Sequence, residues 1–288
     1  MVDNFATTLE QRIEAGMAPA VVGFDPRIES FPRDCAAGES APERILAFYR
    51  EVIPAIAPHI PVVKPNIAFF EQFGWEGFRA YEDTCEAARA AGMLVIGDVK
   101  RGDIGSTAAA YANSHFQWAD AITLHPYLGS DSIEPFLRHC REAGKGVFIL
   151  VRTSNPSAAE FQSLKVTGGS DLSDAVADAV RRWGEGTGDP DGYATVGAVV
   201  GATYGGEIAR LRERMPRAWI LLPGVGAQGA SVADVRAAFD DQGRGALVAQ
   251  SRGIMHCFEP DDPNWRTRIE AAAEKFATEV RSIAHAKT

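Results

Sequence analysis

The stretch LVIGDVKRGDIGST, residues 94–107, passes from an apolar run into charged side chains and is followed by an Ala-rich segment. This order predicts a strand, a charged edge and a helix. Side chains two apart on an extended backbone share a face, so we expect Asp98 and Lys100 to emerge together at the strand end. Asp103 stands where the helix would begin, and an Asp there can cap free backbone N–H groups. A lone surface ion pair rarely contributes more than ~1 kcal/mol and does not explain the placement of Asp98 and Lys100.

The same order, an apolar run ending in polar residues, occurs eight times. The expected strands cover residues 20–24, 60–63, 93–97, 121–124, 147–151, 195–200, 218–222 and 246–250. Helical periodicity covers residues 43–57, 75–91, 104–118, 131–143, 206–214, 231–239 and 265–285, with an extra N-terminal helix ending near residue 17. Near-continuous apolar strands that alternate with helices indicate parallel pairing. The sequence therefore predicts one α/β domain over residues 1–288, a (β/α)8 TIM barrel; an open doubly wound sheet is the second choice.

One connection is longer than the others. Residues 155–193, between the fifth and sixth strands, contain a helical pattern over 171–183 and a Gly/Asp-rich run over 184–190. We expect a surface insertion with a loop tip there.

Composition favours an ordinary globular protein. The 288 residues are 46% hydrophobic and 23% charged, and the net charge of −9 argues against general binding to nucleic acid or anionic membranes. The four cysteines have no metal-finger spacing and are expected as free thiols. The N-terminus lacks the features of a signal peptide, and no apolar run approaches the ~18 residues of a membrane span. We expect a cytoplasmic protein.

Charged and polar residues follow the predicted strands, and the catalytic residues of such barrels lie at these C-terminal strand ends. The residues in question are Asp25, Lys64, Asp98, Lys100, His125, Ser154 and Arg252, and Pro223 falls at the same level. His125 is as consistent with a packed wall as with a catalyst, so no role is assigned to it.

The Gly-rich run GVGAQG, residues 224–229, matches a dinucleotide-binding pattern. A Rossmann fold needs a carboxylate after the next strand, but that strand is followed by Arg252. A turn whose backbone N–H groups hold a phosphate beside Arg252 is the better interpretation, and a simple tight turn is the alternative. A second spacing, Gly97 to Gly102, lacks the lysine of a P-loop because Asp103 follows it.

The remaining cluster combines Lys64 and Lys100 with Asp25, Asp98 and Asp103. Ammonium groups beside the carboxylates would repel a divalent metal, so the alternation of sign favours a metal-free network. Such a network strains an anion placed near Asp98, while Lys100 can give a proton to a carbon that becomes negative. This combination suits decarboxylation. An ion-pair ring that only holds the strand ends is the structural alternative.

These residues resemble the orotidine 5′-phosphate decarboxylase family, in its longer bacterial branch. The resemblance rests on Asp98-x-Lys100-x-x-Asp103, Lys64-Pro65-Asn66, the 223–229 turn and Ser251-Arg252-Gly253-Ile254, and it runs from Asp25 to Ile254. It implies a cofactor-free and metal-free enzyme that converts orotidine 5′-monophosphate to uridine 5′-monophosphate and carbon dioxide.

The resemblance also implies residue roles. Asp98 would lie against the substrate carboxylate, Lys100 would protonate C6, and Lys64 would complete the network. The substrate-binding residues would be Asp25 at the ribose, Ser154 at the pyrimidine, Gln228 and Arg252 at the phosphate, and Pro223 beside them. A homodimer is implied in which Asp103, Ile104 and Thr107 reach the site of the partner subunit.

Two other functions remain open on the sequence. One is a sugar-phosphate enzyme on the same barrel, either a magnesium-dependent decarboxylase or a Schiff-base aldolase using Lys64 or Lys100. The other is a phosphate-ligand binder without catalysis, which the pairing of Asp98 with Lys100 disfavours.

Overall fold

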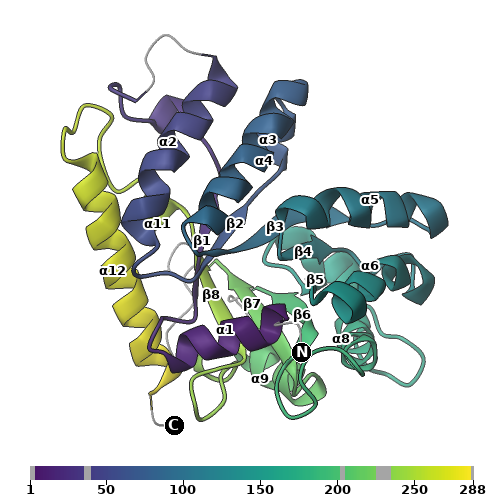
Figure 1. Cartoon of the computed structure of the whole chain (residues 1–288). Coiled ribbons are helices and arrows are strands. Elements are labelled where there is room, and N and C mark those ends of the chain that lie inside the picture. The colour runs from purple at the N-terminus through teal and green to yellow at the C-terminus, as the bar shows by residue number, and fades with distance from the viewer. Residues whose placement is uncertain (1–3, 36–39, 202–204, 225–234, 287–288) are drawn as a thin grey trace.

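The chain folds into a closed barrel of eight parallel strands surrounded by helices (Figure 1). A computed structural model describes residues 4–35, 40–201, 205–224 and 235–286. Each strand pairs with the next along the chain, and the last pairs with the first. The strands are β1 (Ala20–Phe24), β2 (Val62–Pro65), β3 (Leu94–Arg101), β4 (Ala121–Leu124), β5 (Gly146–Arg152), β6 (Ala194–Val200), β7 (Ala218–Pro223) and β8 (Ala246–Gln250). The predicted barrel is confirmed.

The helices lie where the periodicity of the sequence predicts them. They are α1 (Phe5–Glu14), α2 (Ala41–Ile56), α4 (Gly74–Ala90), α5 (Gly105–Trp118), α6 (Ser130–Ala143), α8 (Leu172–Trp183), α9 (Gly205–Arg214) and α12 (Trp265–Ala284). Short helices that the sequence analysis does not predict are α3 (Ala68–Glu71), α7 (Ala159–Gln162) and α11 (Arg252–Met255), with 3-10 turns at Ile28–Ser30 and Pro156–Ala158. Residues 231–234 of the helix expected over 231–239 lie outside the described residues; of the rest, 235 and 236 are helical and 237–239 form a turn and a bend.

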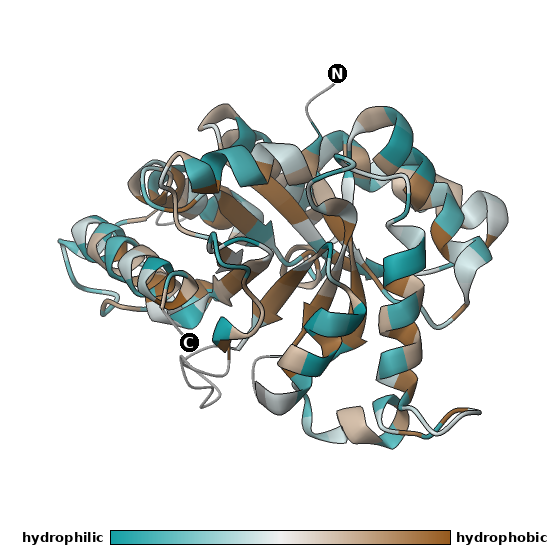
Figure 2. Cartoon of the chain, turned by 90° about the horizontal axis from the view of Figure 1, so that it is seen from below, coloured by the Kyte–Doolittle hydropathy of each residue, from teal (hydrophilic) through white to brown (hydrophobic). Residues whose placement is uncertain are grey.

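The strands are apolar on both faces because each face packs against a different layer. Val22 and Phe24 of β1 belong to the layer between the barrel and the outer helices, whereas Val21 faces the barrel interior. In Figure 2 the hydrophobic colour accordingly gathers on the strands and on the helix faces turned toward them. Such two-sided burial explains why the strands read as continuous apolar runs.

Helix α1 closes the N-terminal end of the barrel. Asn4 caps it by accepting a 3.0 Å hydrogen bond from the Thr7 N–H. Phe5 and Leu9 are buried in the cluster that fills the barrel interior, and the Phe5 ring meets Phe148 edge-on at 5.9 Å between centroids. The expected extra N-terminal helix is therefore present, and it leaves the opposite, C-terminal end of the strands open for a site.

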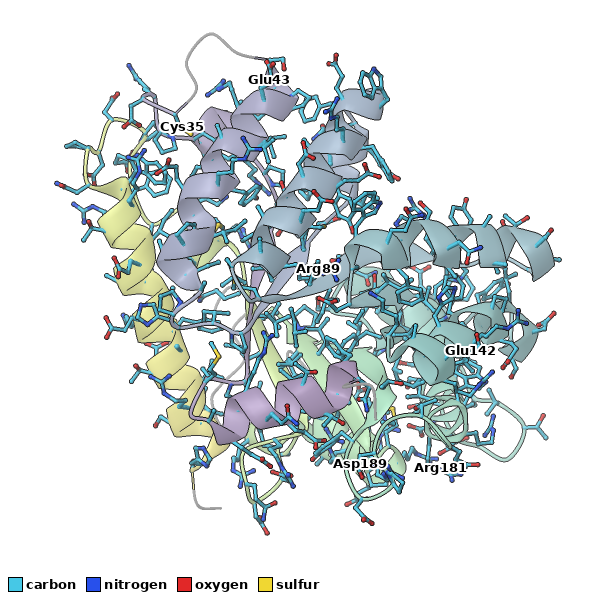
Figure 3. The ribbon with its side chains drawn as sticks, viewed as in Figure 1. Cys35, Glu43, Arg89, Glu142, Arg181 and Asp189 are labelled. Atoms are coloured by element: carbon cyan, nitrogen blue, oxygen red, sulfur yellow. The ribbon has the colours of Figure 1, made fainter. Side chains whose placement is uncertain are left out.

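The long connection over 155–193 runs from one end of the barrel to the other. The connection contains α7 and α8. The Gln162 side chain ties the first part of the connection to the end of β5, because it accepts a hydrogen bond from the Thr153 N–H and donates one to the Thr153 hydroxyl. Residues 186–190 of the tip line a cavity together with α1, and Figure 3 shows Asp189 at that end of the molecule. The loop tip thus belongs to the N-terminal end of the barrel and lies away from the charged strand ends.

All four cysteines lie among the described residues and are free thiols, as expected. Among the helices of the described residues, none combines the length and apolar composition that a membrane crossing needs. The cytoplasmic location stays a prediction.

Candidate active site

The C-terminal strand ends bring together side chains that are far apart in the sequence. Asp25 follows β1, Lys64 lies in β2, Asp98 and Lys100 lie in β3, and Arg252 follows β8. These strands are neighbours around the barrel, in the order β8, β1, β2 and β3. A single isolated bridge between Asn66 and Asp98 extends the pairing of β2 with β3 to this level.

Asp98 is the centre of the charged network. Its Oδ2 accepts a hydrogen bond from the Lys64 ammonium group, and its Oδ1 accepts one from the Lys100 ammonium group. The side chains of Lys64 and Asp98 are only 11% and 8% exposed, whereas that of Lys100 is 50% exposed. The network therefore has a buried half, Lys64 with Asp98, and an accessible ammonium group on Lys100.

The charges in this network stabilise one another. Burial alone would raise the pKa of Asp98, but the ammonium groups of Lys64 and Lys100 outweigh it and hold the pKa far below its ordinary range. Burial alone would lower the pKa of Lys64, but Asp98 and Asp25 outweigh it and raise this pKa. Asp98 is thus an anion and Lys64 a cation at neutral pH.

The backbone of β3 is irregular where it carries these groups. The β3–β4 pairing jumps from Gly97 opposite Ile122 to Arg101 opposite Leu124, so residues 98–100 stand against Thr123 alone. Lys100 has a φ of 43°, in the left-handed region that side chains other than glycine rarely adopt. Asp98 and Lys100 do meet, as the sequence predicts, but across a bulge and not along a regular strand.

Thr123 is a site residue that the sequence analysis missed. Its hydroxyl donates a 3.1 Å hydrogen bond to Asp98 Oδ1 and accepts a 2.9 Å hydrogen bond from the Lys100 backbone N–H. The available signal was a hydroxyl inside the otherwise apolar strand β4, since a buried hydroxyl needs partners.

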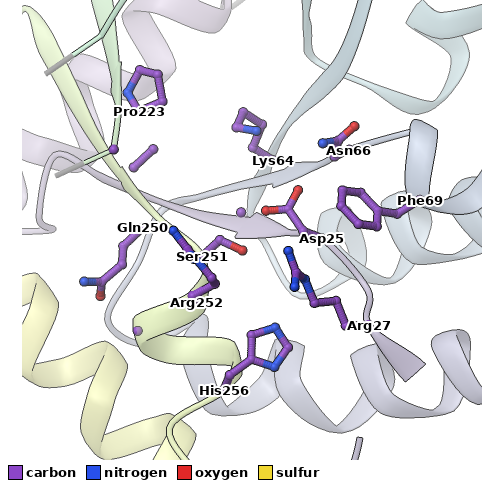
Figure 4. Close-up of a pocket in the computed structure, with 14 residues that line it drawn as sticks. Asp25, Arg27, Lys64, Asn66, Phe69, Pro223, Gln250, Ser251, Arg252 and His256 are labelled. Carbon is purple, nitrogen blue, oxygen red and sulfur yellow. The ribbon is translucent and has the colours of Figure 1, made fainter. Parts of the chain in front are cut away.

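A cavity of about 560 Å³ opens beside the network (Figure 4). Its described lining includes Asp25, Lys64, Pro223 and Arg252, all predicted, and also Arg27, Asn66, Phe69, Gln250, Ser251 and His256, which were not. Three of these side chains are cationic, namely Arg27, Lys64 and Arg252, against the single carboxylate of Asp25. The cavity therefore favours an anionic ligand, although the whole chain is acidic. Gln228 and most of the Gly-rich turn lie outside the described residues.

Asp103, Ile104 and Thr107 lie beyond the end of β3. The Asp103 carboxylate accepts a 2.8 Å hydrogen bond from the neighbouring Ile104 N–H, and Ile104, not Asp103, takes the N-cap position of α5. Interpreting Asp103 as a helix cap is therefore wrong. Ile104 and Thr107 are exposed, and the described lining of the cavity includes none of these three residues.

Ser154 and His125, which also follow predicted strands, each pack against a glycine at this end of the barrel. Ser154 packs against Gly201 after β6, where an added Cβ would lie 3.0 Å from the Ser154 Cβ, and it is absent from the described cavity lining. His125 packs so closely on Gly102 that an added Cβ there would lie 2.1 Å from its Nε2. The His125 ring thus packs against the β3–α5 segment.

Fold and site together define a class of enzyme: a (β/α)8 barrel with a lysine–aspartate–lysine network and a cationic cavity at the C-terminal strand ends. Within that class, the chain belongs to the orotidine 5′-phosphate decarboxylase / HUMPS family, whose family model matches residues 38–260. The resemblance seen in the sequence is therefore confirmed.

Individual relatives match over nearly their full length. The chain is 41% identical to the orotidine 5′-phosphate decarboxylase of Rhodopirellula baltica, over 93% of this chain and 96% of the relative. It is 42% identical to that of Deinococcus radiodurans, over 89% and 90%. The solved structure of Leishmania donovani OMP decarboxylase superposes with a TM-score of 0.80 at 34% identity, covering 97% of this chain and 98% of that one.

Proposed function

We propose that this chain converts orotidine 5′-monophosphate to uridine 5′-monophosphate and carbon dioxide, a step of pyrimidine biosynthesis. Its family and its near-full-length relatives support this activity. The observation that carries the mechanism is Asp98, whose two oxygens each hold a lysine ammonium group beside a cationic cavity.

The proposed chemistry needs a buried anion and a ready proton. The bond between C6 and the carboxylate carbon breaks, its electron pair stays on C6, and carbon dioxide leaves. The ionised Asp98 faces the substrate carboxylate, and their repulsion is relieved as that charge moves away. The Lys100 ammonium group transfers a proton to C6 and regains one from water. Lys64 balances the charge of Asp98 throughout.

The cavity supplies binding energy at a distance from the reacting carbon. Asp25 would accept hydrogen bonds from the ribose hydroxyls, and Arg252 would pair with the phosphate, both from the cavity wall. We propose the same phosphate role for Gln228, with Pro223 beside it, and a pyrimidine contact for Ser154. Holding the phosphate positions the far end of the substrate against Lys100.

The two rival chemistries on this barrel fit the network less well. A Schiff-base aldolase needs a neutral lysine, whereas Asp98 and Asp25 raise the pKa of Lys64. A metal-dependent enzyme would need free carboxylate oxygens, whereas both oxygens of Asp98 already accept from ammonium groups.

The test is an assay of the purified protein that follows the loss of orotidine 5′-monophosphate absorbance with EDTA present. We expect full turnover in EDTA and no adduct after borohydride treatment. The matched variant Lys100→Ala should lose at least about 1,000-fold in kcat while still binding uridine 5′-monophosphate. Binding without turnover by the unaltered protein would instead identify a non-catalytic binder, and substantial activity in Lys100→Ala would reject the proton-donor role.

We further propose that the active form is a homodimer in which Asp103, Ile104 and Thr107 reach the site of the partner subunit. Support comes from exposed apolar side chains beyond three neighbouring strands: Ile104 after β3, Tyr127 and Leu128 after β4, and Phe161 and Leu164 after β5. Exposed apolar residues gathered in this way are typical of an interaction surface. A second copy is the partner that would also give Asp103 a place beside a catalytic network.

A further inference from the structure

We propose that Thr123 is a positioning residue for the proton donor. Its hydroxyl joins the Asp98 carboxylate to the Lys100 backbone and so holds the Lys100 ammonium group where the reaction needs it. This inference rests on the proposed decarboxylation.

The first support is that the Thr123 hydroxyl, in a buried strand, both donates and accepts a hydrogen bond. Thr123 is 1% exposed on β4. Its O–H donates to Asp98 Oδ1 at 3.1 Å, while its oxygen accepts the Lys100 N–H at 2.9 Å. Both contacts go to the two residues of β3 that carry the chemistry, and a valine of the same shape could make neither.

The second support is the bulge that faces Thr123. Three residues of β3, from Asp98 to Lys100, stand opposite this single residue of β4. The Lys100 N–H is therefore out of register with the regular hydrogen-bond ladder between β3 and β4. The Thr123 side chain bonds this N–H in place of a strand carbonyl. The left-handed φ of Lys100, 43°, is a strained conformation that persists only where the surroundings enforce it.

The third support is that these contacts converge on one oxygen. Asp98 Oδ1 accepts from the Lys100 ammonium group and from Thr123, so the hydroxyl fixes the orientation of the carboxylate and of its lysine together. The described cavity lining does not include Thr123. Its removal should therefore affect the chemical step more than ligand binding.

The experiment compares Thr123→Val, which keeps the shape and removes the hydroxyl, with Thr123→Ser, which keeps the hydroxyl. We expect Thr123→Val to lose about 10- to 100-fold in kcat, the usual effect of losing a hydrogen bond to a charged group. KM and the affinity for uridine 5′-monophosphate should change less than about 3-fold, because the cavity wall is intact. Thr123→Ser should recover most of kcat.

Each other outcome has a defined meaning. Unchanged kcat in a folded Thr123→Val overturns the inference, and so does an equal loss of kcat and nucleotide binding. Thr123→Ala removes the same hydroxyl and replaces Thr123→Val if that variant does not fold. If neither folds while Thr123→Ser does, the hydroxyl serves folding and the inference is rejected. An inactive wild-type protein would instead refute the proposed function.

Discussion

A single carboxylate, Asp98, determines the charge state of the candidate site. It is buried, yet it accepts hydrogen bonds from two lysines and a threonine that come from three different strands. Removing one partner of a buried ion pair leaves the other charge uncompensated, which costs more than the pair contributes. The protonation of Lys64 therefore depends on Asp98, and this dependence can be measured through stability.

We predict that Asp98→Asn changes how stability depends on pH. In the native protein the pKa of Asp98 is lowered and that of Lys64 is raised. The Asp98 contribution is lost only as pH falls below about 4, and the Lys64 contribution only as pH rises above about 10, so stability from this pair is flat between these limits. In Asp98→Asn, burial lowers the pKa of Lys64, and stability should rise with pH.

Urea unfolding between about pH 6 and pH 9.5 measures this difference. Asp241→Asn, which changes an exposed carboxylate, is the control and should keep the native profile. A flat profile for Asp98→Asn would show that Lys64 does not need its partner to stay charged.

At the scale of elements, the segment from β3 to α5 carries Asp98 and Lys100 of the candidate site. Besides the Thr123 hydrogen bonds, this segment makes a close contact between Gly102 and the His125 ring after β4. The Arg101 carbonyl also accepts a 3.1 Å hydrogen bond from the His125 N–H. A side chain at position 102 must displace either the ring or the segment.

We therefore predict that Gly102→Ala lowers kcat/KM by about 10-fold, because the displaced segment carries Asp98 and Lys100 and a misplaced catalytic group slows the reaction. Overpacking should also cost on the order of 1–3 kcal/mol of stability. Replacing the ring as well, in Gly102→Ala with His125→Ala, should restore most of the activity. Gly206→Ala is the matched control, because an added Cβ there meets nothing within 4 Å. If the double variant is no better than Gly102→Ala, the contact with His125 is not the cause.

The sequence predicts the regular elements because their apolar runs and periodic patterns extend over enough residues to be recognised. The eight strands follow from near-continuous apolar runs and most helices from apolar residues with a period of 3.6, and the spacing of Asp98 and Lys100 correctly predicts that they meet. The bulge could not be predicted, because the rule that side chains alternate between two faces holds only for a regular strand. The residue types also give no sign of the positive φ of Lys100.

The same limit explains the missed residues. Thr123 bonds across two strands whose register the sequence does not fix, and Arg27 and His256 reach the cavity from a loop and the end of a four-residue helix. Hydrophobic periodicity cannot be recognised in segments this short. Gln228 stays a prediction.

On the scale of the whole molecule, the two ends of the barrel differ: one is closed by a helix and the other carries the candidate site. Helix α1 fills the N-terminal end, and the tip of the 155–193 segment lines a cavity beside it. The opposite end carries the charged network, the cavity and, beyond neighbouring strands, exposed Ile104, Tyr127 and Phe161. A partner docked on these apolar residues would approach the candidate site itself, so dimerisation and catalysis should be linked.

We predict that subunits of Asp103→Ala and Lys100→Ala, each inactive or nearly so alone, regain activity when mixed. If Asp103 acts in the partner's site, a mixed dimer has one site with native Lys100 and native Asp103. Random mixing in equal amounts should then give about one quarter of native activity, because half of the dimers are mixed and each has one intact site of two. Mixing Lys100→Ala with Asp98→Ala is the control and should give no recovery, since those two residues pair within one chain. Mixed dimers confirmed by native mass spectrometry but lacking activity would place Asp103 outside the partner's site.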